Sequence, residues 1–318
     1  PLSYRGWPDE STQPRGLCRV PASTPMAREI RGLSGPVKPL RPFSARENNG
    51  LMVTTERSAF EFLGDWSGQF IATAIHKGHD VRPEVAAVLV LPDEDRLREE
   101  DPHTDEIGAL VPARVVVHRS RFEVDLNRSR EKAVYRSAEE AWGLEVVRDP
   151  PLDQALVAGS LEMYDAFYAE LGRRLDVVAE RGPFVVFDIH SYNHRRDGAD
   201  APEASWAENP EVNVGTGSLD RGLFGSVADA FIESLTQAGT SAGPLDVREN
   251  VRFRGQQLAA WTHARYPGRA AVLALEFKKT FMDEWTGEAD HARIDELARA
   301  VASTIPSLEE ALLELATP

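Results

Sequence analysis

Short apolar runs along the chain predict buried β-strands, and three of these runs lead directly into an ionisable residue. They are residues 70–75 before His76, residues 184–189 before His190, and residues 271–275 before Glu276. Continuous apolar runs rich in β-branched residues are typical of strands covered on both faces of a largely parallel sheet. The carboxyl ends of parallel strands meet at one edge, where ligands bind in such folds. We therefore expect the two imidazoles and the carboxylate to lie close together at that edge.

Apolar positions that recur every three or four residues predict amphipathic helices between the strands. The clearest stripe runs from Leu161 to Val178 and stops at Gly182-Pro183, directly before the second strand. Further stripes cover residues 219–235 and 294–312, and we expect the latter to break near Pro306 because proline disrupts a helix interior. Strands that alternate with helices indicate an α/β fold with helices covering the sheet.

The N-terminal segment differs from the rest of the chain. Residues 1–45 hold eight of the 21 prolines, with scattered arginine and serine and no helical or strand period. This composition predicts an extended Pro/Arg-rich arm, because it offers little apolar surface to bury. The remaining residues, 46–318, show no second linker and no repeat, which favours a single domain. Within it, the polar stretches 199–210 and 239–244 are expected to be surface loops.

Charge and composition narrow the range of partners. The net charge of −15 argues against nucleic acid, because binding a phosphate backbone needs a basic stripe. The negative net charge does not exclude a small anionic substrate, since a pocket can be basic inside an acidic protein. The chain has no run of 18 apolar residues, so no membrane span is expected. Cys18 is the single cysteine, which rules out an intrachain disulfide, and the simplest interpretation is a cytoplasmic protein.

Histidine spacing predicts a zinc centre. His79 follows His76 by three residues with Gly78 between them, a spacing at which two ligands can converge from a tight turn. Together with His190 these residues form a three-ligand set that leaves a fourth position for water, and neutral imidazoles suit zinc better than magnesium or calcium. Two oxygen ligands remain alternatives to His79, namely Asp80 and Glu84.

Carboxylates accompany the predicted zinc ligands. Asp188 precedes His190 by two residues on the same strand face, where it can orient the imidazole ring. Glu276 lies at the end of an apolar strand and is followed by two lysines, Lys278 and Lys279. A glutamate so placed beside zinc can take a proton from a water molecule and deliver it to a leaving amine.

A third polar segment, residues 118–128, combines arginine with asparagine. A guanidinium can hold a carboxylate through two parallel hydrogen bonds, and an adjacent amide can add a third. Taken alone, such a charged run is also typical of a solvated surface. We interpret this segment as functional because the same chain also carries the histidines and Glu276.

Four of these elements, in consistent order between Ile71 and Gly287, resemble the N-formylglutamate amidohydrolase family, which is similar to the zinc carboxypeptidases. The elements are His76-Lys77-Gly78, Ser120 through Arg128, Asp188 through Ser191, and Glu276 running to Met282-Asp283-Glu284. The loop with Asn250 and Phe253-Arg254-Gly255 resembles a further loop of that family. The resemblance implies a mixed, largely parallel twisted sheet with helices on both faces, a zinc carboxypeptidase-like (phosphorylase/hydrolase-like) core.

The resemblance also implies an activity and roles for residues. It implies a zinc-dependent amidohydrolase, with one Zn²⁺ per chain, that cleaves a small N-acyl amino acid such as an N-formylglutamate-like substrate, or a related carboxylate-bearing amide. The implied roles are a base for Glu276, an oxyanion stabiliser for Arg121, and substrate binding for Asn127, Arg128, Arg254 and Tyr192. A metallopeptidase acting on a peptide and a metal-binding inactive homologue remain alternatives. Carboxypeptidases carry glutamate three residues after the first histidine, where this chain has His79.

Overall fold

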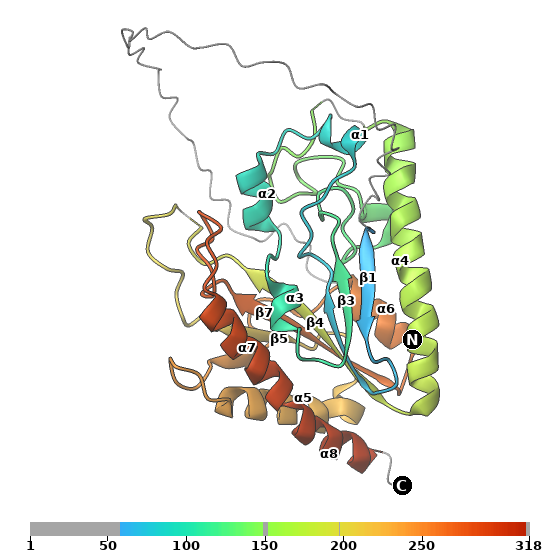
Figure 1. Cartoon of the computed structure of the whole chain (residues 1–318), viewed down its shortest axis with the longest axis vertical. Helices are drawn as coiled ribbons and strands as arrows, with labels where there is room; N and C mark the ends of the chain where they lie inside the picture. Colours follow the sequence, from blue (N-terminus) through green and yellow to red (C-terminus); the bar gives the residue numbers. More distant parts are fainter. Residues whose placement is uncertain (1–57, 149–151, 197, 316–318) are drawn as a thin grey trace, which may run out of the picture. The chain divides into compact units, whose positions relative to one another are not determined.

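A seven-stranded sheet runs through the part of the chain that the structure, a computed structural model, describes: residues 58–148, 152–196 and 198–315 (Figure 1). Its strands are β1 (Phe60–Gly64), β2 (Phe70–Ala74), β3 (Ala113–Val117), β4 (Phe184–Tyr192), β5 (Val212–Gly215), β6 (Val247–Glu249) and β7 (Ala270–Lys278). The arm expected over residues 1–45 lies outside the described residues. The division into an arm and a single domain therefore stays a prediction.

The strands lie in the order β1-β3-β2-β4-β7-β5-β6. The central strands β3, β2, β4 and β7 run parallel to one another, as do β5 and β6. The strand β1 runs antiparallel to β3, and β5 runs antiparallel to β7. The expected mixed, largely parallel sheet is thus confirmed.

The three apolar runs that lead into His76, His190 and Glu276 form the strands β2, β4 and β7. These strands are neighbours in the sheet. Two of these strands are longer than expected. Both β4 and β7 continue for two residues beyond His190 and Glu276, respectively. His190 pairs with Glu276 in the ladder between the two strands. The ladder continues because β5 pairs with the end of β7 as well, opposite Phe277 and Glu276. Both side chains therefore sit inside strands, and only His76 follows its strand.

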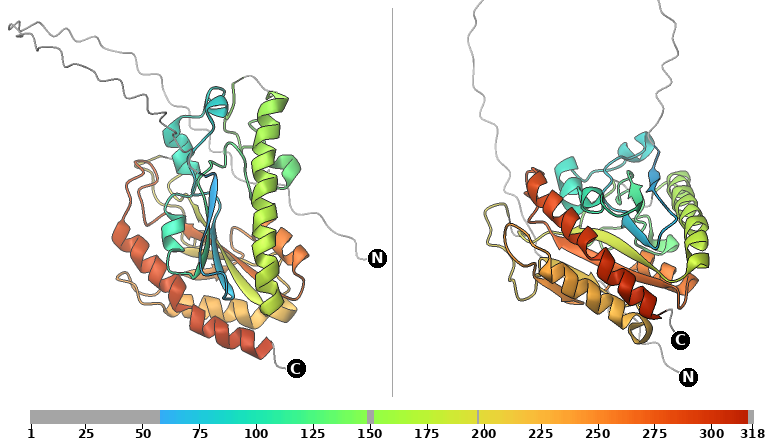
Figure 2. Two further views of the ribbon diagram at one scale, coloured as in Figure 1. Left: turned by 45° about the vertical axis from the view of Figure 1, so that its right-hand side comes forward. Right: turned by 60° about the horizontal axis from the view of Figure 1, so that its bottom comes forward.

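Helices cover both faces of the sheet, as expected (Figure 2). They are α1 (Pro83–Ala86), α2 (Asp93–Glu99), α3 (Thr104–Ile107), α4 (Gln154–Arg181), α5 (Arg221–Gln237), α6 (Gln257–Arg265), α7 (His291–Ser303) and α8 (Ile305–Leu315), with a 3₁₀ turn at Arg130–Lys132. The helices α4 and α6 pack on one face, and α5, α7 and α8 pack on the other. None of the helices in the described ranges is both long and apolar enough to span a membrane.

Local sequence explains where the helices begin and end. The side chain of Asp153 caps α4 by accepting the Ala155 N–H at 2.7 Å. The same helix ends at Gly182, with φ of 146°, before Pro183 turns the chain into β4. The C-terminal stripe is interrupted at Thr304, and Pro306 lies in the first turn of α8, where proline is tolerated. The expected break is confirmed.

Alternation along β4 decides which side of the sheet carries chemistry. Val185, Phe187 and Ile189 pack into the cluster that includes α5, α7 and α8. The intervening residues Phe184 and Val186 pack against α4 and α6. Because strand side chains alternate, the next even-numbered positions, which include His190, continue the row that faces α4 and α6. The polar end of that row forms the candidate site.

Candidate metal centre and active site

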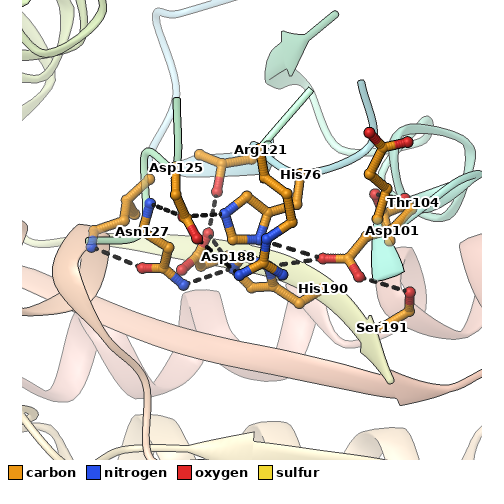
Figure 3. A network of polar contacts seen from close by, with 12 residues as sticks. His76, Asp101, Thr104, Arg121, Asp125, Asn127, Asp188, His190 and Ser191 are labelled. Atoms are coloured by element: carbon orange, nitrogen blue, oxygen red, sulfur yellow. Dashed lines mark hydrogen bonds and ion pairs between the residues drawn. The ribbon is translucent and has the colours of Figure 1, made fainter. Parts of the chain in front are cut away.

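His76 and His190 face each other at the carboxyl ends of the neighbouring strands β2 and β4 (Figure 3). Their ring centroids are 4.9 Å apart, and both side chains are buried. The carboxylate of Asp101 lies between them, with its Oδ2 at 3.5 Å from His76 Nδ1 and 3.1 Å from His190 Nδ1. One ligand atom from each residue lies within 4.8 Å of the other two. These three side chains can hold a metal ion.

Asp101 belongs to the connection between α2 and α3, and its backbone holds it in place. Its N–H donates to the His76 carbonyl at 2.9 Å, and its own carbonyl accepts the Thr104 hydroxyl at 2.7 Å. The second carboxylate oxygen accepts the Ser191 hydroxyl at 3.0 Å. Sequence reasoning missed Asp101, because it closes an acidic run before Pro102 that looks like an ordinary solvated segment.

The structure places His79 outside this group, which corrects the expected ligand set. Its Nδ1 lies 2.5 Å from Glu100 Oε2, and its Nε2 lies 3.0 Å from Arg96 Nη2, so both ring nitrogens have other partners. The alternatives Asp80 and Glu84 are exposed and also lie outside the group. The third member of the group that could hold a metal is Asp101.

Close backbone packing explains why the chain turns away after His76. A Cβ on Gly78 would lie 2.2 Å from the carbonyl carbon of His118, so only glycine permits this approach. The Asp80 N–H donates to the His118 carbonyl at 3.0 Å, and the Ser120 N–H donates to the Asp80 carbonyl at 2.8 Å. These contacts fasten residues 78–80 to the 118–120 segment, and the His79 ring is directed to Glu100 instead of Asp101.

Carboxylates also hold the outer nitrogens of both histidines. His76 Nε2 lies 2.7 Å from Asp125 Oδ1, and His190 Nε2 lies 3.2 Å from Asp188 Oδ1, as expected for Asp188. The Thr73 hydroxyl donates to the same Asp188 oxygen at 2.7 Å. Such pairs fix ring orientation and tautomer in metal sites. With both Nε2 atoms engaged, both Nδ1 atoms are directed at Asp101, which fits a metal ion held between them.

Buried charges are balanced around Asp125. Its carboxylate accepts a hydrogen bond from Arg121 Nη2 at 2.8 Å, another from the Tyr135 hydroxyl, and a third from the Asn127 N–H at 2.9 Å. Burial by itself works to raise the pKa of Asp125, but Arg121 and His76 outweigh it and hold that pKa well below its usual range. The carboxylate is therefore ionised, and it in turn keeps Arg121 charged.

The centre as a whole favours positive charge between its ligands. Burial acts to lower the pKa of His190, yet Asp188 and Asp101 raise it well above the ordinary histidine value. Hydrogen bonds from His190 and His76 overcome burial at Asp101 and hold the pKa of that carboxyl below its usual range. A divalent cation satisfies the same demand, so the donor set and its electrostatics fit a metal.

The segment 121–128 borders the centre as expected, but its arginines already have partners. The Asn127 amide lies 3.4 Å from His190 Nε2, and its Oδ1 accepts the Leu258 N–H at 3.1 Å. Arg121 stacks at 4.9 Å from the Trp142 ring centroid in addition to its bond with Asp125. Arg128 donates to the Glu140 carbonyl at 2.6 Å and lies 4.6 Å from the Tyr135 ring centroid.

Glu276 lies opposite His190 on one side and opposite Asn213 on the other. Burial raises the pKa of Glu276 to about 8, and Asp101 and Asp188 act in the same direction, whereas His190 and Arg121 oppose them. A carboxyl group that titrates near neutral pH beside a possible metal site is suited to proton transfer.

Tyr192 and Arg254, which were expected to bind substrate, do not both lie at the candidate centre. The buried Tyr192 lies on the same strand face as His190, but its hydroxyl donates to the Pro210 carbonyl. Arg254 is exposed, and its neighbour Arg252 instead lies over the Tyr192 ring, with Cζ 5.9 Å from the centroid. The substrate-binding roles expected for Tyr192 and Arg254 therefore remain predictions.

A hollow of about 540 Å³ opens elsewhere, lined by His194, Glu203 and residues between Lys279 and His291. None of the group His76, Asp101 and His190 lines it, and neither does Glu276. The candidate metal centre and Glu276 therefore do not line this hollow.

Three solved structures are similar to this chain, and the first two share its fold. The N-formylglutamate amidohydrolase from Ralstonia eutropha JMP134 is 17% identical, with a TM-score of 0.61 over 80% of this chain and 97% of that one. The gene product Atu2144 from Agrobacterium tumefaciens is 16% identical, with a TM-score of 0.57 over 79% and 95%. The carboxypeptidase A from Helicoverpa armigera is 11% identical, with a TM-score of 0.43 over 81% and 65%. No curated protein matches the chain.

The family model of N-formylglutamate amidohydrolase matches residues 68–282, which is well over half of the chain. This range contains both histidines of the candidate centre, Asp101 and Glu276. The match agrees with the resemblance in sequence and supports a hydrolase that acts on amides. The chain belongs to the N-formylglutamate amidohydrolase family.

Proposed function

We propose that this protein is a zinc-dependent amidohydrolase that cleaves the amide of a small N-acyl amino acid, with N-formylglutamate as the first candidate substrate. The observation that carries the proposal is the convergence of His76, Asp101 and His190, with Glu276 opposite His190 in the sheet. Family membership supports amide hydrolysis as the reaction class.

Zinc is the proposed metal, with His76 Nδ1, Asp101 Oδ2 and His190 Nδ1 as its ligands. Two imidazoles and one carboxylate are a donor set typical of catalytic zinc sites. Zinc bound there supplies Lewis acidity, which makes water more acidic and polarises an amide carbonyl. Asp125 and Asp188 keep the two rings in the orientation that this binding requires.

Glu276 is the proposed acid and base. Burial favours the protonated form of Glu276, whereas His190 and Arg121 favour the ionised form, and the ionised form is the one that would accept a proton from the attacking water. The water oxygen joins the carbonyl carbon, and the C–N bond breaks as the same carboxyl delivers the proton to the leaving nitrogen. The products are a carboxylic acid and a free amino acid.

Arg121 is the proposed stabiliser of the negative charge that develops on the carbonyl oxygen. Its hydrogen bond to Asp125 at 2.8 Å and its contact with Trp142 fix the guanidinium before substrate arrives. A cation oriented in advance is more effective than one that must reorganise during the reaction. Asn127 and Arg128 border the same site as further substrate contacts.

The test combines metal analysis with product detection. Purified protein is assayed for zinc by mass spectrometry and for formate release from N-formyl-L-glutamate, before and after chelation and zinc addition. A blocked dipeptide with a free carboxylate is assayed in parallel to detect a peptidase. Stoichiometric zinc with zinc-dependent formate release supports the proposal. Absence of zinc, or cleavage of the dipeptide alone, contradicts it.

A further inference from the structure

Lys279 is a buried lysine that directly follows β7, and the residue is only 1% exposed. Its ammonium group donates to two backbone carbonyls, that of Arg98 at 2.5 Å and that of Glu100 at 2.7 Å. A buried charge is costly unless it is paired or hydrogen-bonded. An apolar side chain would fill the same space at a lower cost, so the ammonium of Lys279 indicates a role beyond packing.

The two carbonyls belong to the end of α2. The last carbonyls of a helix have no partner within the helix, and a lysine suits them through its hydrogen bonds and its positive charge. The helix ends at Glu99, and Glu100 after it is extended, with φ of −82° and ψ of 177°. Because Lys279 comes from the end of β7, its side chain fixes where α2 ends relative to the sheet.

Asp101 follows this contact directly. The Glu100 carbonyl that accepts from Lys279 belongs to the peptide bond between Glu100 and Asp101. The N–H of the same peptide unit donates to the His76 carbonyl at 2.9 Å. One peptide unit is therefore held by Lys279 through its oxygen and by His76 through its nitrogen. These two bonds fix the backbone from which the Asp101 carboxylate reaches the two imidazoles.

Lys279 leaves the carboxylate of Asp101 directed at the histidines. Its Oδ2 lies beside both imidazoles, and its Oδ1 accepts the Ser191 hydroxyl (Figure 3). Burial lowers the pKa of Lys279, and among the carboxylates that oppose this effect Asp101 acts most strongly, followed by three glutamates. The ammonium is thus close enough to be stabilised by Asp101 without binding its oxygens.

The same lysine is tied to the strand that carries Glu276. Lys279 follows Glu276 by three residues, and its backbone N–H donates to the Tyr192 carbonyl at 3.0 Å. This bond extends the pairing of β4 with β7. The proposed base and the segment that carries the proposed third ligand are therefore connected through one side chain.

We propose that Lys279 is a positioning residue that holds Asp101 at the metal centre by fastening the end of α2 to the end of β7. The proposal rests on the proposed function, in which Asp101 is a zinc ligand, and extends it to a residue that contacts neither metal nor substrate. Groups that orient metal ligands typically contribute about 10- to 100-fold to metal affinity. We expect a loss of that order when the ammonium is removed.

The sign of the change separates positioning from charge. Removal of a positive charge near the centre would by itself raise zinc affinity, because two cations repel each other. Loss of positioning lowers it. The two causes therefore predict opposite results for the same substitution.

The experiment measures zinc affinity by competition with a chelator of known affinity, so it does not depend on turnover. Lys279→Met removes the ammonium and keeps the length of the side chain, whereas Lys279→Arg keeps a charged donor. Lys278→Met is the matched control, because the ammonium of this neighbouring buried lysine has no hydrogen bond. Lys279→Met is also combined with Asp101→Ala, and the metal-free proteins are compared by amide hydrogen exchange.

We expect zinc affinity to fall about 10- to 100-fold in Lys279→Met, to recover in part in Lys279→Arg, and to stay close to that of the parent in Lys278→Met. In the Asp101→Ala background, Lys279→Met should lower the affinity no further, because the ligand that Lys279 positions is gone. An unchanged or higher affinity in Lys279→Met overturns the proposal. An equal further loss in the Asp101→Ala background also overturns it, because it would indicate a general loss of structure.

Hydrogen exchange provides an outcome that does not depend on zinc. If the parent binds no zinc, the proposed function fails, and exchange in the metal-free proteins decides. Faster exchange confined to residues 98–107 in Lys279→Met, and absent in Lys278→Met, supports the positioning role. Exchange that is unchanged there, or that rises across the whole sheet, overturns it.

Discussion

The imidazole of His76 is held through Nε2 by Asp125 at 2.7 Å, which leaves Nδ1 as the nitrogen directed at Asp101. The hydrogen bond therefore selects which atom of the ring can bind a metal. It also connects the centre to Arg121, because the other Asp125 oxygen accepts from that guanidinium. The proposed metal binding and the proposed oxyanion stabilisation by Arg121 therefore share one buried carboxylate, Asp125.

The ligand assignment predicts different effects for two nearby residues. Asp101→Ala removes one of three proposed ligands, so we expect zinc affinity to fall by at least ~100-fold, as even outer partners of ligands contribute 10- to 100-fold. His79→Ala removes only contacts with Glu100 and Arg96, so stoichiometric zinc is retained. Zinc content after dialysis against a weak chelator measures both. Full zinc occupancy in Asp101→Ala would disprove this assignment.

Glu276→Gln is expected to keep zinc and lose activity. The substitution preserves size but removes proton transfer, which typically contributes 10²- to 10⁴-fold. We therefore expect kcat to fall by about that factor, with zinc content and melting temperature close to those of the unsubstituted protein. Steady-state kinetics with N-formyl-L-glutamate, together with metal analysis, provide the measurement. Activity within tenfold of the parent removes Glu276 from the mechanism.

Gly78→Ala is expected to destabilise the fold next to the centre. The added Cβ would lie 2.2 Å from His118 backbone, which cannot move without displacing the neighbouring segment. Overpacking of this kind costs about 1–3 kcal/mol. Gly68→Ala is the matched control, because a Cβ there meets nothing within 4 Å. Urea unfolding of both variants tests the prediction, and equal midpoints would argue against tight packing at Gly78.

His263 makes stability depend on pH. Burial lowers its pKa to about 4, and its Nε2 accepts the Val272 N–H at 2.9 Å, which requires the neutral ring. The unfolded chain takes up this proton near pH 6.5, so the contribution is complete above that pH and is lost as pH falls toward 4. We expect about 3 kcal/mol to be lost across this window.

The variant His263→Gln isolates this effect, since glutamine can accept the same N–H without titrating. Urea midpoints at pH 7.5 and pH 5 are compared in the two proteins. The parent should lose more stability than the variant between these pH values. Parallel losses in both would show that other groups cause the pH dependence.

Much of the fold and part of the site follow from sequence. Apolar runs identified β2, β4 and β7, and because these strands are adjacent and parallel, His76 and His190 meet as expected. Asp101 lies in a connection with no strand or helical period, so no pattern points to it. His79 was chosen from spacing alone, which contains no information on the competing contact with Glu100. Long-range packing decides such cases, and it is absent from local patterns.

Asp101 comes from the connection between α2 and α3, whereas His190 lies in β4 and His76 follows β2. The proposed metal ion would therefore cross-link the central strands to the segment that carries Asp101. Removal of the ion should release that segment first, and amide hydrogen exchange in α2 and α3 should rise before exchange in the central strands does. In the proposed function, the metal would then stabilise the α2–α3 segment as well as support the reaction.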